Sequence, residues 1–257
     1  MKRNIMKISI MVFIATCVAL LISFIIPTVF KKGGVSAMGD KGTLYNEETF
    51  TRHRKQMVEE QIANRGIRDK RVLDAMEAVP RHLFIPDENR AYSYWDQPVP
   101  IGLGQTISQP YIVAFMTELL KVDKDDTVLE VGTGTGYQSA ILAMLAGQVY
   151  TIEIVEELGN NAFKRLKTMG YSNIEGKIGD GYKGWPEHAP FDAIIVTAAA
   201  EHIPQPLIEQ LKPGGRMVIP VGGVYEVQDL MLITKDASSK VIKESIIPVR
   251  FVPLIRK

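Results

Sequence analysis

Three glycines at alternate positions, Gly132, Gly134 and Gly136, follow an apolar run that contains a single acid, Glu130. Glycine allows positive φ and lets the backbone approach a ligand without a Cβ in the way. The pattern therefore predicts a strand that enters a helix through a tight, ligand-binding turn, although a plain strand-helix connection would also explain the glycines. The spacing departs from the dinucleotide fingerprint G-x-G-x-x-G, because no glycine or alanine stands three residues after Gly134.

Two further acids stand at the ends of the next predicted strands. The strand expected over 148–153 ends at Glu153, about 20 residues past the first glycine, where nucleotide-binding α/β units place the acid that binds both ribose hydroxyls. After a strand expected over 174–178, Asp180 lies between two glycines and could accept a hydrogen bond from an adenine amino group. Together they favour a nucleoside site, but Glu153 could also be a helix-start acid and Asp180 an Asx-turn residue.

Residues 8–30 form an uncharged, almost wholly apolar run. This run is long enough to span a bilayer, which takes about 20 apolar residues, and it exceeds the usual 7 to 15 of a cleaved signal. We expect an uncleaved membrane anchor, with a signal cleaved near residues 35–37 as the alternative. Lysine and arginine flank both sides of the run, so the positive-inside rule does not orient it. Cys17 is the only cysteine, which excludes a disulfide framework.

We divide the chain into an anchor and tether over 1–40 and a single domain over 41–257. A little over 200 residues suffice for one α/β domain with a sizeable core but not for two of ordinary size. The net charge is only +1, and the basic cluster at 52–55 is followed by Glu59 and Glu60 on the same expected helix. This is typical of a solvated helix face, so we expect no nucleic-acid partner.

Before the glycine turn, the pattern predicts helices over 49–64 and from Asp69, as N-cap, to Pro80. Residues 80–100 are rich in aromatic side chains and proline without a clear period, which predicts an ordered and functional loop.

Ser108 precedes the apolar helix expected over 111–120. One interpretation makes it the N-cap, with Pro110 in the first turn. The other makes the hydroxyl and the backbone amides at this helix start a carboxylate site. The two interpretations are compatible.

After Asp180, the expected elements are strands over 191–197, 216–222, 229–234 and 245–252 and a helix over 204–211. Alternating strands and helices followed by strands alone predict an α/β fold, a doubly wound and mostly parallel sheet that closes with a hairpin.

With these residues in hand, the chain resembles the protein-L-isoaspartate O-methyltransferases, also called protein-repair or protein β-aspartate methyltransferases, over about residues 54–254. The segments that carry the resemblance are residues 78–81, 104–111, 128–137, 179–181 and 249–254. The glycine turn occurs in many S-adenosylmethionine enzymes, whereas residues 106–110 are particular to this family.

The resemblance implies the Rossmann-like class I methyltransferase fold, with S-adenosylmethionine as methyl donor and S-adenosylhomocysteine as product. The residues implied to bind the cofactor are Glu130, Gly132, Gly134 and Gly136 at the methionine part, Glu153 at the ribose, and Asp180 and Gly181 at the adenine. Ser108 matches the family's active-site serine, and Thr106 and Ile107 line the same acceptor pocket. Residues 249–254 correspond to the family's carboxyl-terminal segment near the acceptor.

The family's substrates are damaged proteins that contain L-isoaspartyl residues, whose free α-carboxylate is methylated so that repair proceeds through a succinimide. A carboxylate, with a reference pKa of about 3.5 to 4, is already ionised at neutral pH, so its methylation needs neither a strong base nor a metal. The four histidines show no metal-ligand spacing. We therefore expect Ser108 to orient the acceptor by hydrogen bonding.

Three competing interpretations were weighed. An NAD-dependent oxidoreductase is disfavoured by the glycine spacing. A methyltransferase of amines or nucleic acids would more often carry an Asn/Asp-Pro-Pro-aromatic motif where this chain has Thr197 and three alanines. A membrane-tethered cofactor-binding protein without turnover is disfavoured by the presence of Ser108, Glu153 and Asp180. Because S-adenosylmethionine is made in the cytosol, we expect a cytoplasmic catalytic domain, with an exported one as the alternative.

Overall fold

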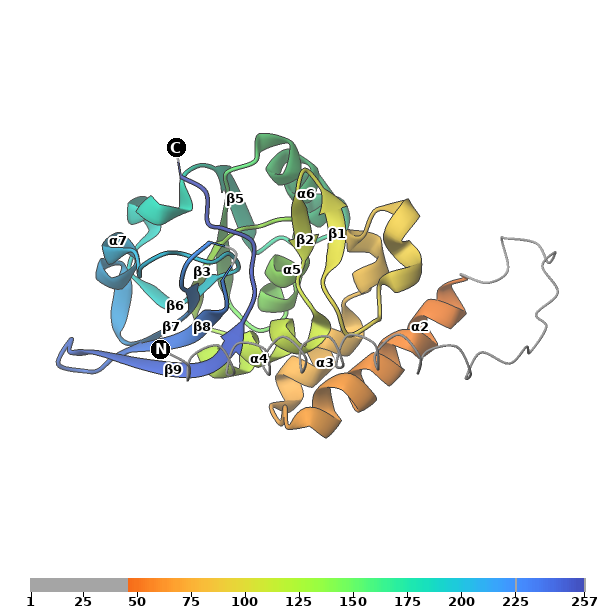
Figure 1. Ribbon diagram of the computed structural model, residues 1–257, viewed down its shortest axis with the longest axis horizontal. Coiled ribbons are helices and arrows are strands. Elements are labelled where there is room, and N and C mark those ends of the chain that lie inside the picture. Colours follow the sequence, from red (N-terminus) through yellow and green to blue (C-terminus); the bar gives the residue numbers. More distant parts are fainter. Residues whose placement is uncertain (1–45, 225, 257) are drawn as a thin grey trace, which may run out of the picture. The chain divides into compact units, whose positions relative to one another are not determined.

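A seven-stranded sheet forms the centre of the computed structural model, which describes residues 46–224 and 226–256 (Figure 1). Its strands are β3 (Thr127–Val131), β4 (Gln148–Glu153), β5 (Ile174–Ile178), β6 (Phe191–Val196), β7 (Leu211–Val221), β8 (Gln228–Lys235) and β9 (Val241–Val249). They lie in the order β5-β4-β3-β6-β7-β8-β9. The pairs among β3 to β7 are parallel, and β8 pairs antiparallel with both β7 and β9. The predicted mostly parallel sheet with a closing hairpin is confirmed.

The order of the sheet reverses at β3, which pairs with β4 on one side and β6 on the other. In open α/β sheets such a switch point leaves a crevice outside the carboxyl ends of the strands, because the connections on either side of it leave in opposite directions. The glycine turn follows β3 directly. The topology therefore places it at the position where these folds bind ligands.

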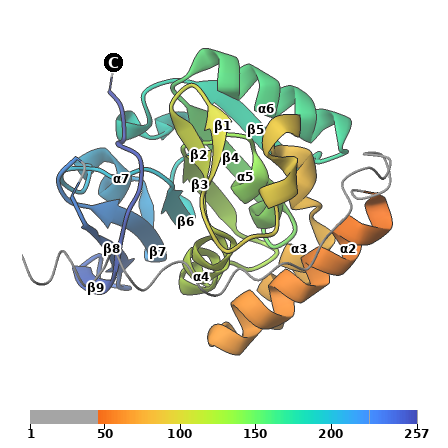
Figure 2. The same cartoon turned by 45° about the vertical axis from the view of Figure 1, so that its right-hand side comes forward.

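Six α-helices surround the sheet in the described part of the chain: α2 (Glu47–Gln56), α3 (Lys70–Ala78), α4 (Pro110–Leu120), α5 (Tyr137–Ala143), α6 (Glu156–Thr168) and α7 (Gln205–Glu209). The helix predicted over 49–64 is present as α2 followed by a π-helical stretch, Met57–Ile62, and a 3₁₀ turn, Ala63–Arg65. Asp69 caps α3 as predicted, since its side chain accepts a hydrogen bond from Arg71 N at 2.9 Å. Figure 2 shows α2 and α3, in orange, packed together and α7, in blue, on the opposite side of the molecule.

The core lies on both faces of the sheet, because successive strand side chains point to opposite sides. In β3, Val128 joins the cluster formed with α3, α4 and α5, whereas Leu129 and Val131 join the cluster on the side of α7. Glu130 occupies the next position on the face of Val128, and its side chain is fully buried. An acid therefore stands at a core position of the central strand.

The segment between α3 and α4 is ordered, as its aromatic content predicted. It contains 3₁₀ turns over Arg81–Phe84 and Asp87–Tyr92 and then a small antiparallel hairpin, β1 (Val99–Gly102) and β2 (Gln105–Ile107). The sequence analysis missed this hairpin because strands of three and four residues are too short to show a period.

The start of β7 also differs from expectation. The strand was expected over 216–222 but begins at Leu211, and residues 212–215 form an irregular start of β7 with a register shift against β6.

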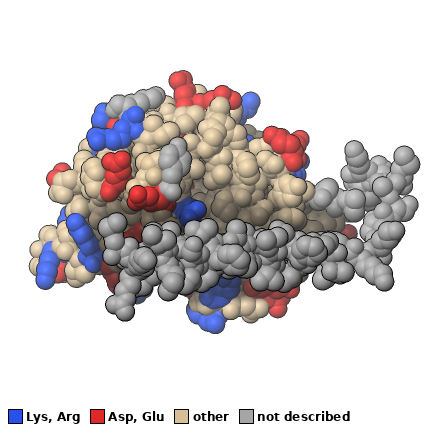
Figure 3. All heavy atoms as spheres, in the orientation of Figure 1, with Lys and Arg blue, Asp and Glu red and all other residues tan. Residues whose placement is uncertain are grey.

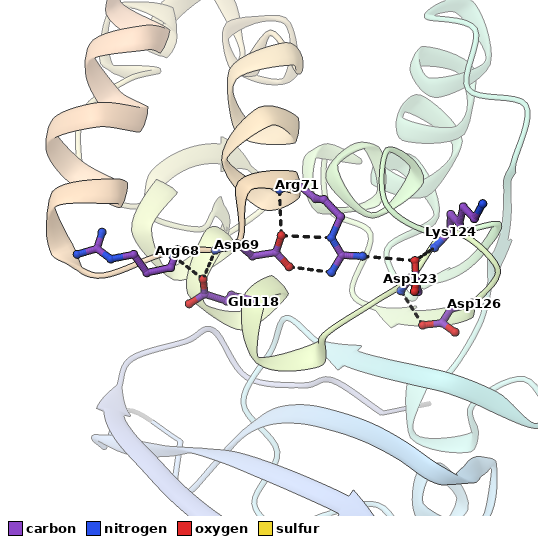
Figure 4. Close-up of polar contacts among 7 residues, drawn as sticks. All are labelled: Arg68, Asp69, Arg71, Glu118, Asp123, Lys124 and Asp126. Atoms are coloured by element: carbon purple, nitrogen blue, oxygen red, sulfur yellow. Dashed lines mark hydrogen bonds and ion pairs between the residues drawn. The ribbon is translucent and has the colours of Figure 1, made fainter.

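A group of seven residues, here called the polar cluster, joins the start of α3 to α4 and to the loop before β3 (Figure 4). Its members are Arg68, Asp69, Arg71, Glu118, Asp123, Lys124 and Asp126. Glu118 Oε1 accepts hydrogen bonds from the backbone N–H groups of Arg68 at 2.6 Å and Asp69 at 2.7 Å. Arg71 contacts Asp69 at 2.8 Å and Asp123 at 3.4 Å. Each acid in this arrangement has a donor partner from another segment or a neighbouring residue.

On the face drawn in Figure 3, acidic and basic side chains are interspersed over a mostly uncharged surface. Residues 46–256 fall within one compact unit. None of the helices in the described ranges is long and apolar enough to cross a membrane. The predicted anchor over 8–30 and the predicted domain start at residue 41 lie outside the described residues.

Candidate active site

A cavity, here called the first cavity, opens at the carboxyl ends of β3, β4 and β6. The strands and the glycine turn line one side of it, and the β1–β2 hairpin and the chain end line the other. Its lining residues are Ile101, Gln105, Thr106, Val131, Gly132, Gly134, Ile152–Val155, Leu158, Gly181, Thr197, Ala198 and Val252–Ile255. The cavity thus lies at the switch point of the sheet.

The glycine turn is tight because strands β3 and β6 end against each other there. Gly132 has a φ of +98°, and a Cβ at this position would lie only 2.4 Å from Thr197 Oγ1. The Thr197 hydroxyl contacts the carbonyl oxygens of Gly132 at 2.7 Å and Val131 at 3.1 Å, as donor. Only glycine fits this position, and the backbone of the turn is left open towards the cavity.

Glu153 fastens the same turn from the end of β4. Its Oε2 accepts a hydrogen bond from Gly134 N at 2.8 Å, and its Oε1 accepts from Ile154 N and Val155 N at 2.9 Å each. The helix-start interpretation therefore holds in part, because these two amides lead into α6. An ionised carboxylate offers about four acceptor positions, so Glu153, which lines the first cavity, keeps capacity for a ligand hydroxyl.

Asp180 forms the Asx turn that was one of its two interpretations, with Oδ1 accepting from Tyr182 N at 3.0 Å. Its Oδ2 is buried and has no partner among the described residues. Buried polar atoms are nearly always hydrogen-bonded, so an orphaned carboxylate oxygen indicates a missing donor. The following Gly181 lines the first cavity and packs so closely that a Cβ there would lie 2.3 Å from Val131 Cγ1.

Glu130 does not line any of the cavities at this edge, so the structure gives no support to a direct contact with the methionine part of a cofactor. Its side chain points into the core towards α5, where Oε2 accepts from Thr151 Oγ1 at 2.7 Å and from Ser139 Oγ. Oε1 is buried without a partner in the described part of the chain. Burial raises the pKa of Glu130 to about 8. The expected contact and the observed position differ because side chains alternate along a strand. At position 130 the side chain points to one face of the sheet, into the core, and not towards the cavities at the strand ends.

A second cavity separates the glycine turn from the segment that joins β2 to α4. It is lined by Thr106, Ile107, Ser108, Val113, Met116, Gly132–Thr135, Tyr137, Gln138 and Thr197. All three predicted acceptor-site residues, 106 to 108, therefore face the glycine turn across one cavity.

A third cavity, of about 380 Å³, lies on the other side of the same segment. It is lined by Pro98, Thr106, Ser108, Gln109, Ile112, Thr197, Val227 and Pro248–Val252. The carboxyl-terminal segment that was expected near the acceptor thus forms one of its walls. Thr106 and Thr197 line all three cavities, and Ser108 lines the second and the third. The cavities meet at these two threonines.

Ser108 is not the N-cap of α4, so that interpretation was wrong. The cap is Gln109, without a side-chain capping bond, and Pro110 is the first helical residue. Asp96 takes the capping role from a distant loop, since Oδ1 accepts from Tyr111 N at 3.4 Å and Oδ2 accepts from Gln109 Nε2 at 2.7 Å. The hydroxyl of Ser108 has no hydrogen-bond partner among the described residues, and Ser108 lines the second and the third cavity.

Two residues of this site were missed by the sequence analysis. Thr197 was noted only because a different motif was absent there, although its place after the buried strand β6, beside the switch point, could have identified it. Arg81 was noted only as part of a family segment. It is fully buried and donates to the carbonyl oxygen of Ser108 at 2.7 Å, a contact that no local pattern reveals.

The site can hold an elongated ligand that has hydroxyls near Glu153, an amino group near Asp180 and a second part beside the glycine turn. A separate acceptor can approach through the third cavity. Among the residues that the structure describes, no group of three or more His, Cys, Asp or Glu side chains is arranged to hold a metal ion. The order of the sheet and the cavities at the carboxyl ends of its strands define the class I methyltransferase fold. In this fold a nucleoside cofactor lies across those strand ends.

Comparison with known proteins identifies the family. The family model described as Protein-L-isoaspartate(D-aspartate) O-methyltransferase (PCMT) matches residues 52–257. The chain belongs to this family. The match includes the whole glycine turn, both acids at the strand ends and the segment of Ser108.

Individual relatives agree with this assignment. Protein-L-isoaspartate O-methyltransferase 2 of Syntrophobacter fumaroxidans is 61% identical over 72% of this chain and 75% of its own length. A crystal structure from Plasmodium falciparum, described as a protein-L-isoaspartate O-methyltransferase in complex with S-adenosyl-L-homocysteine, is 28% identical with a TM-score of 0.68, over 79% of this chain and 99% of that chain. Another solved protein-L-isoaspartate O-methyltransferase is 27% identical with a TM-score of 0.70, and the match covers 78% of this chain and 65% of that one.

Proposed function

We infer that this chain transfers a methyl group from S-adenosylmethionine to the free α-carboxylate of L-isoaspartyl residues in damaged proteins. The resulting ester collapses to a succinimide, which hydrolyses partly to normal aspartate, and S-adenosylhomocysteine is the other product. The family match over residues 52–257 supports the reaction class. The observation that carries the assignment to this site is the meeting of three cavities at Thr106 and Thr197. One cavity suits a nucleoside, one suits its methionine part and one suits an acceptor.

We propose that the cofactor is held along the switch point. Glu153 would bind the ribose hydroxyls with the acceptor position that its three backbone donors leave open, and Asp180 Oδ2 would accept from the adenine amino group beside Gly181. The glycine turn, Gly132 to Gly136, would lie along the methionine part. When bound, S-adenosylmethionine supplies a methyl group carried on a positively charged sulfur. The S-adenosyl-L-homocysteine bound in the Plasmodium falciparum structure supports a site of this kind.

The acceptor side needs positioning more than proton transfer, because the attacking carboxylate is ionised at neutral pH. We propose that the Ser108 hydroxyl donates to this carboxylate and orients it, with Thr106 and Ile107 completing the pocket. The apolar side chains of Pro98, Ile112 and Val252 form part of the wall of the third cavity, and less polar surroundings strengthen the interactions of a charged group. Holding reacting atoms about 3 to 3.5 Å apart can by itself lower a barrier by about 7 to 11 kcal/mol.

The decisive experiment measures transfer of labelled methyl from S-adenosylmethionine to an isoaspartyl peptide, with the matching aspartyl peptide as control, using the full chain. We expect base-labile label on the isoaspartyl peptide alone. Equal labelling of both peptides would contradict the substrate assignment. Cofactor binding without transfer to either peptide would favour a binding protein without this activity.

Ser108→Ala tests the acceptor side. Loss of one oriented hydrogen bond to a charged group is expected to lower kcat by about 10- to 100-fold, because such bonds contribute about 1.5 to 3 kcal/mol. The dissociation constant of S-adenosylhomocysteine should change little. Ser245→Ala is the matched control, since that hydroxyl donates to Asp229 Oδ1 at 3.0 Å and Ser245 lines none of the three cavities. Normal turnover of Ser108→Ala would refute the role of Ser108.

We further propose that residues 8–30 anchor the protein to a membrane and that the domain over 41–257 faces the cytoplasm. The length of the apolar run and the cytosolic origin of S-adenosylmethionine support this proposal. Two separate assays test it. Alkaline extraction of membranes tests anchoring, and protease digestion of sealed vesicles tests orientation. Release of the full-length chain into the soluble fraction would contradict anchoring, and a domain digested only from the outer side of the cell would favour export.

A further inference from the structure

Arg81 is a fully buried arginine at the start of the first 3₁₀ turn after α3. In the part of the chain that the structure describes, it forms no ion pair with a carboxylate. Burial lowers the pKa of its guanidinium, which nevertheless stays charged at neutral pH. A buried charge without a counter-ion is costly, so a fold retains it only where other groups compensate it.

The compensating groups come from two backbone carbonyls and one aromatic ring. Arg81 Nε donates to the carbonyl oxygen of Ser93 at 2.8 Å, and Nη2 donates to the carbonyl oxygen of Ser108 at 2.7 Å. The guanidinium carbon lies 4.8 Å from the centre of the Tyr137 ring, a distance at which the ring face attracts a cation. Nη1 is buried without a partner among the described residues.

These contacts join the two sides of the reaction site. Ser108 lines the second and the third cavity, next to the acceptor. Tyr137 is the first residue of α5, directly after Gly136, and lines the second cavity from the side of the glycine turn. The planar guanidinium is a rigid fork with fixed donor directions. Through it, the acceptor segment and the glycine turn share one support.

We propose that Arg81 is a positioning residue that fixes Ser108 relative to the glycine turn and so aligns the acceptor carboxylate with the methyl donor. The inference rests on the proposed roles of Ser108 and of the cofactor cavity. Displacement of a positioned group by about 1 Å can lower a rate by about 100-fold. An arginine that served packing alone would gain little here, because an apolar side chain of similar volume fills a buried site without the cost of desolvating a charge.

Arg54 provides a matched comparison in the same helical layer. Its Nε donates to the carbonyl oxygen of Glu77 at 2.6 Å and its Nη1 to Tyr94 Oη at 3.3 Å. It therefore makes the same kind of bond from a side chain to the backbone, but its partners, Glu77 and Tyr94, line none of the three cavities. We therefore expect loss of Arg54 to remove a bond of this kind while the contact between Arg81 and Ser108 stays in place.

The experiment measures kcat and KM for an isoaspartyl peptide, the dissociation constant of S-adenosylhomocysteine and thermal unfolding for Arg81→Met, Arg81→Lys and Arg54→Met in the full chain. We expect Arg81→Met to lower kcat by about 30- to 100-fold while the dissociation constant changes by less than about threefold. Arg81→Lys, which keeps the charge but not the fork, should recover part of kcat. Arg54→Met should lower the unfolding temperature and leave kcat within about twofold. Equal losses of kcat in Arg54→Met and Arg81→Met would overturn the proposal.

A double-mutant cycle separates positioning from general destabilisation. In a Ser108→Ala background, Arg81→Lys should lower kcat by less than about threefold, because the hydroxyl that Arg81 positions is already absent. If the loss of kcat in the double variant equals the product of the losses in the two single variants, the proposal is overturned. The cycle uses Arg81→Lys, so it tests the proposal even where Arg81→Met does not fold. A wild-type chain that labels no isoaspartyl peptide would refute the proposed function instead. If Arg81→Lys and Arg81→Met are both fully active while Ser108→Ala is impaired, only the role of Arg81 is refuted.

Discussion

Glu118 and Glu153 use the same chemistry in two regions of the molecule, for different ends. Glu118, in the polar cluster, accepts from two backbone amides and holds the start of α3 against α4 (Figure 4). Glu153 accepts from three backbone amides and holds the glycine turn against β4. The difference is what lies beside them, because Glu118 is surrounded by ion pairs, whereas Glu153 borders a cavity.

The acids of the two regions also differ in their pKa values and in whether every carboxylate oxygen has a hydrogen-bond donor. In the polar cluster, the hydrogen bond from Arg71 lowers the pKa of Asp69 below its usual value. Near the glycine turn, burial raises the pKa of Glu130 to about 8, and the Asp180 carboxylate keeps a buried oxygen without a partner. The paired acids of the polar cluster stabilise the fold, and Glu130 lies in the core away from the cavities. The unpartnered oxygen of Asp180, next to Gly181 of the first cavity, indicates a place for a ligand.

The sharpest test of this comparison is the pair Glu153→Ala and Glu118→Ala. Glu153→Ala should weaken S-adenosylhomocysteine binding by at least about 100-fold, or about 3 kcal/mol, because it frees the glycine turn and removes the ribose acceptor. Glu118→Ala should lower the free energy of unfolding by about 1 to 2 kcal/mol and leave binding unchanged. Calorimetric titration and urea unfolding of both variants measure the two effects. Equal binding losses would erase the distinction between the regions.

Asp180→Asn is expected to have the next largest effect. The amide keeps one acceptor oxygen for Tyr182 N but can place an NH₂ group where the orphaned oxygen stood. Facing an adenine amino group, that donor has no acceptor, and binding of S-adenosylhomocysteine should weaken about tenfold, or about 1.4 kcal/mol. The same titration checks it, with adenine replaced by purine in the ligand as a control. An unchanged ratio between the two ligands in the variant and the wild type would contradict the contact.

Glu130 predicts a pH dependence of stability with a defined sign. Its folded pKa, about 8, is above the value near 4.5 of an unfolded glutamate, so the folded state binds one more proton between these two pH values. Its contribution to the free energy of unfolding is therefore fully present below about pH 4.5 and is lost as the pH rises to about 8, with a slope of at most about 1.4 kcal/mol per pH unit. Urea unfolding at pH 5 to 8 should show a flatter profile for Glu130→Gln than for the wild type. Parallel profiles would show that Glu130 does not titrate in this range.

The smallest effect is expected in the polar cluster itself. Arg71 is half exposed, at 51% for its side chain, and exposed ion pairs contribute about 0 to 1 kcal/mol. Arg71→Ala should therefore lower the free energy of unfolding by less than about 1 kcal/mol, with a smaller difference at high salt, and should leave kcat unchanged. A loss of kcat would mean that the two regions are coupled, against the comparison drawn above.

Several features were readable from local sequence because local interactions create them. The cap at Asp69 and the strand over 148–153 were predicted at the residues where the structure has them. The parallel sheet and its closing hairpin followed from the order of apolar segments. The Asx turn at Asp180 was foreseen as one of two interpretations, and the structure adds that the other carboxylate oxygen remains available.

Other features depend on residues that meet only after folding. Ser108 had the pattern of an N-cap, but Asp96 reaches the start of α4 from another loop and leaves the serine free. Glu130 has the sequence position of a ligand-facing acid, yet strand alternation turns it into the core. Thr197 is marked in the sequence only by its place after a buried strand, and no local pattern reveals the contact of Arg81 with Ser108.

The sequence alone determined the class of fold, the glycine turn and the family, because these follow from apolar periodicity, backbone freedom at glycine and a run of residues particular to one family. Only the tertiary structure decided which acids keep a free oxygen, which serine keeps a free hydroxyl and which threonine closes the turn. Those properties depend on which donors and acceptors pair with each other. The paired groups lie far apart in the chain and meet only once the strands and loops have folded together.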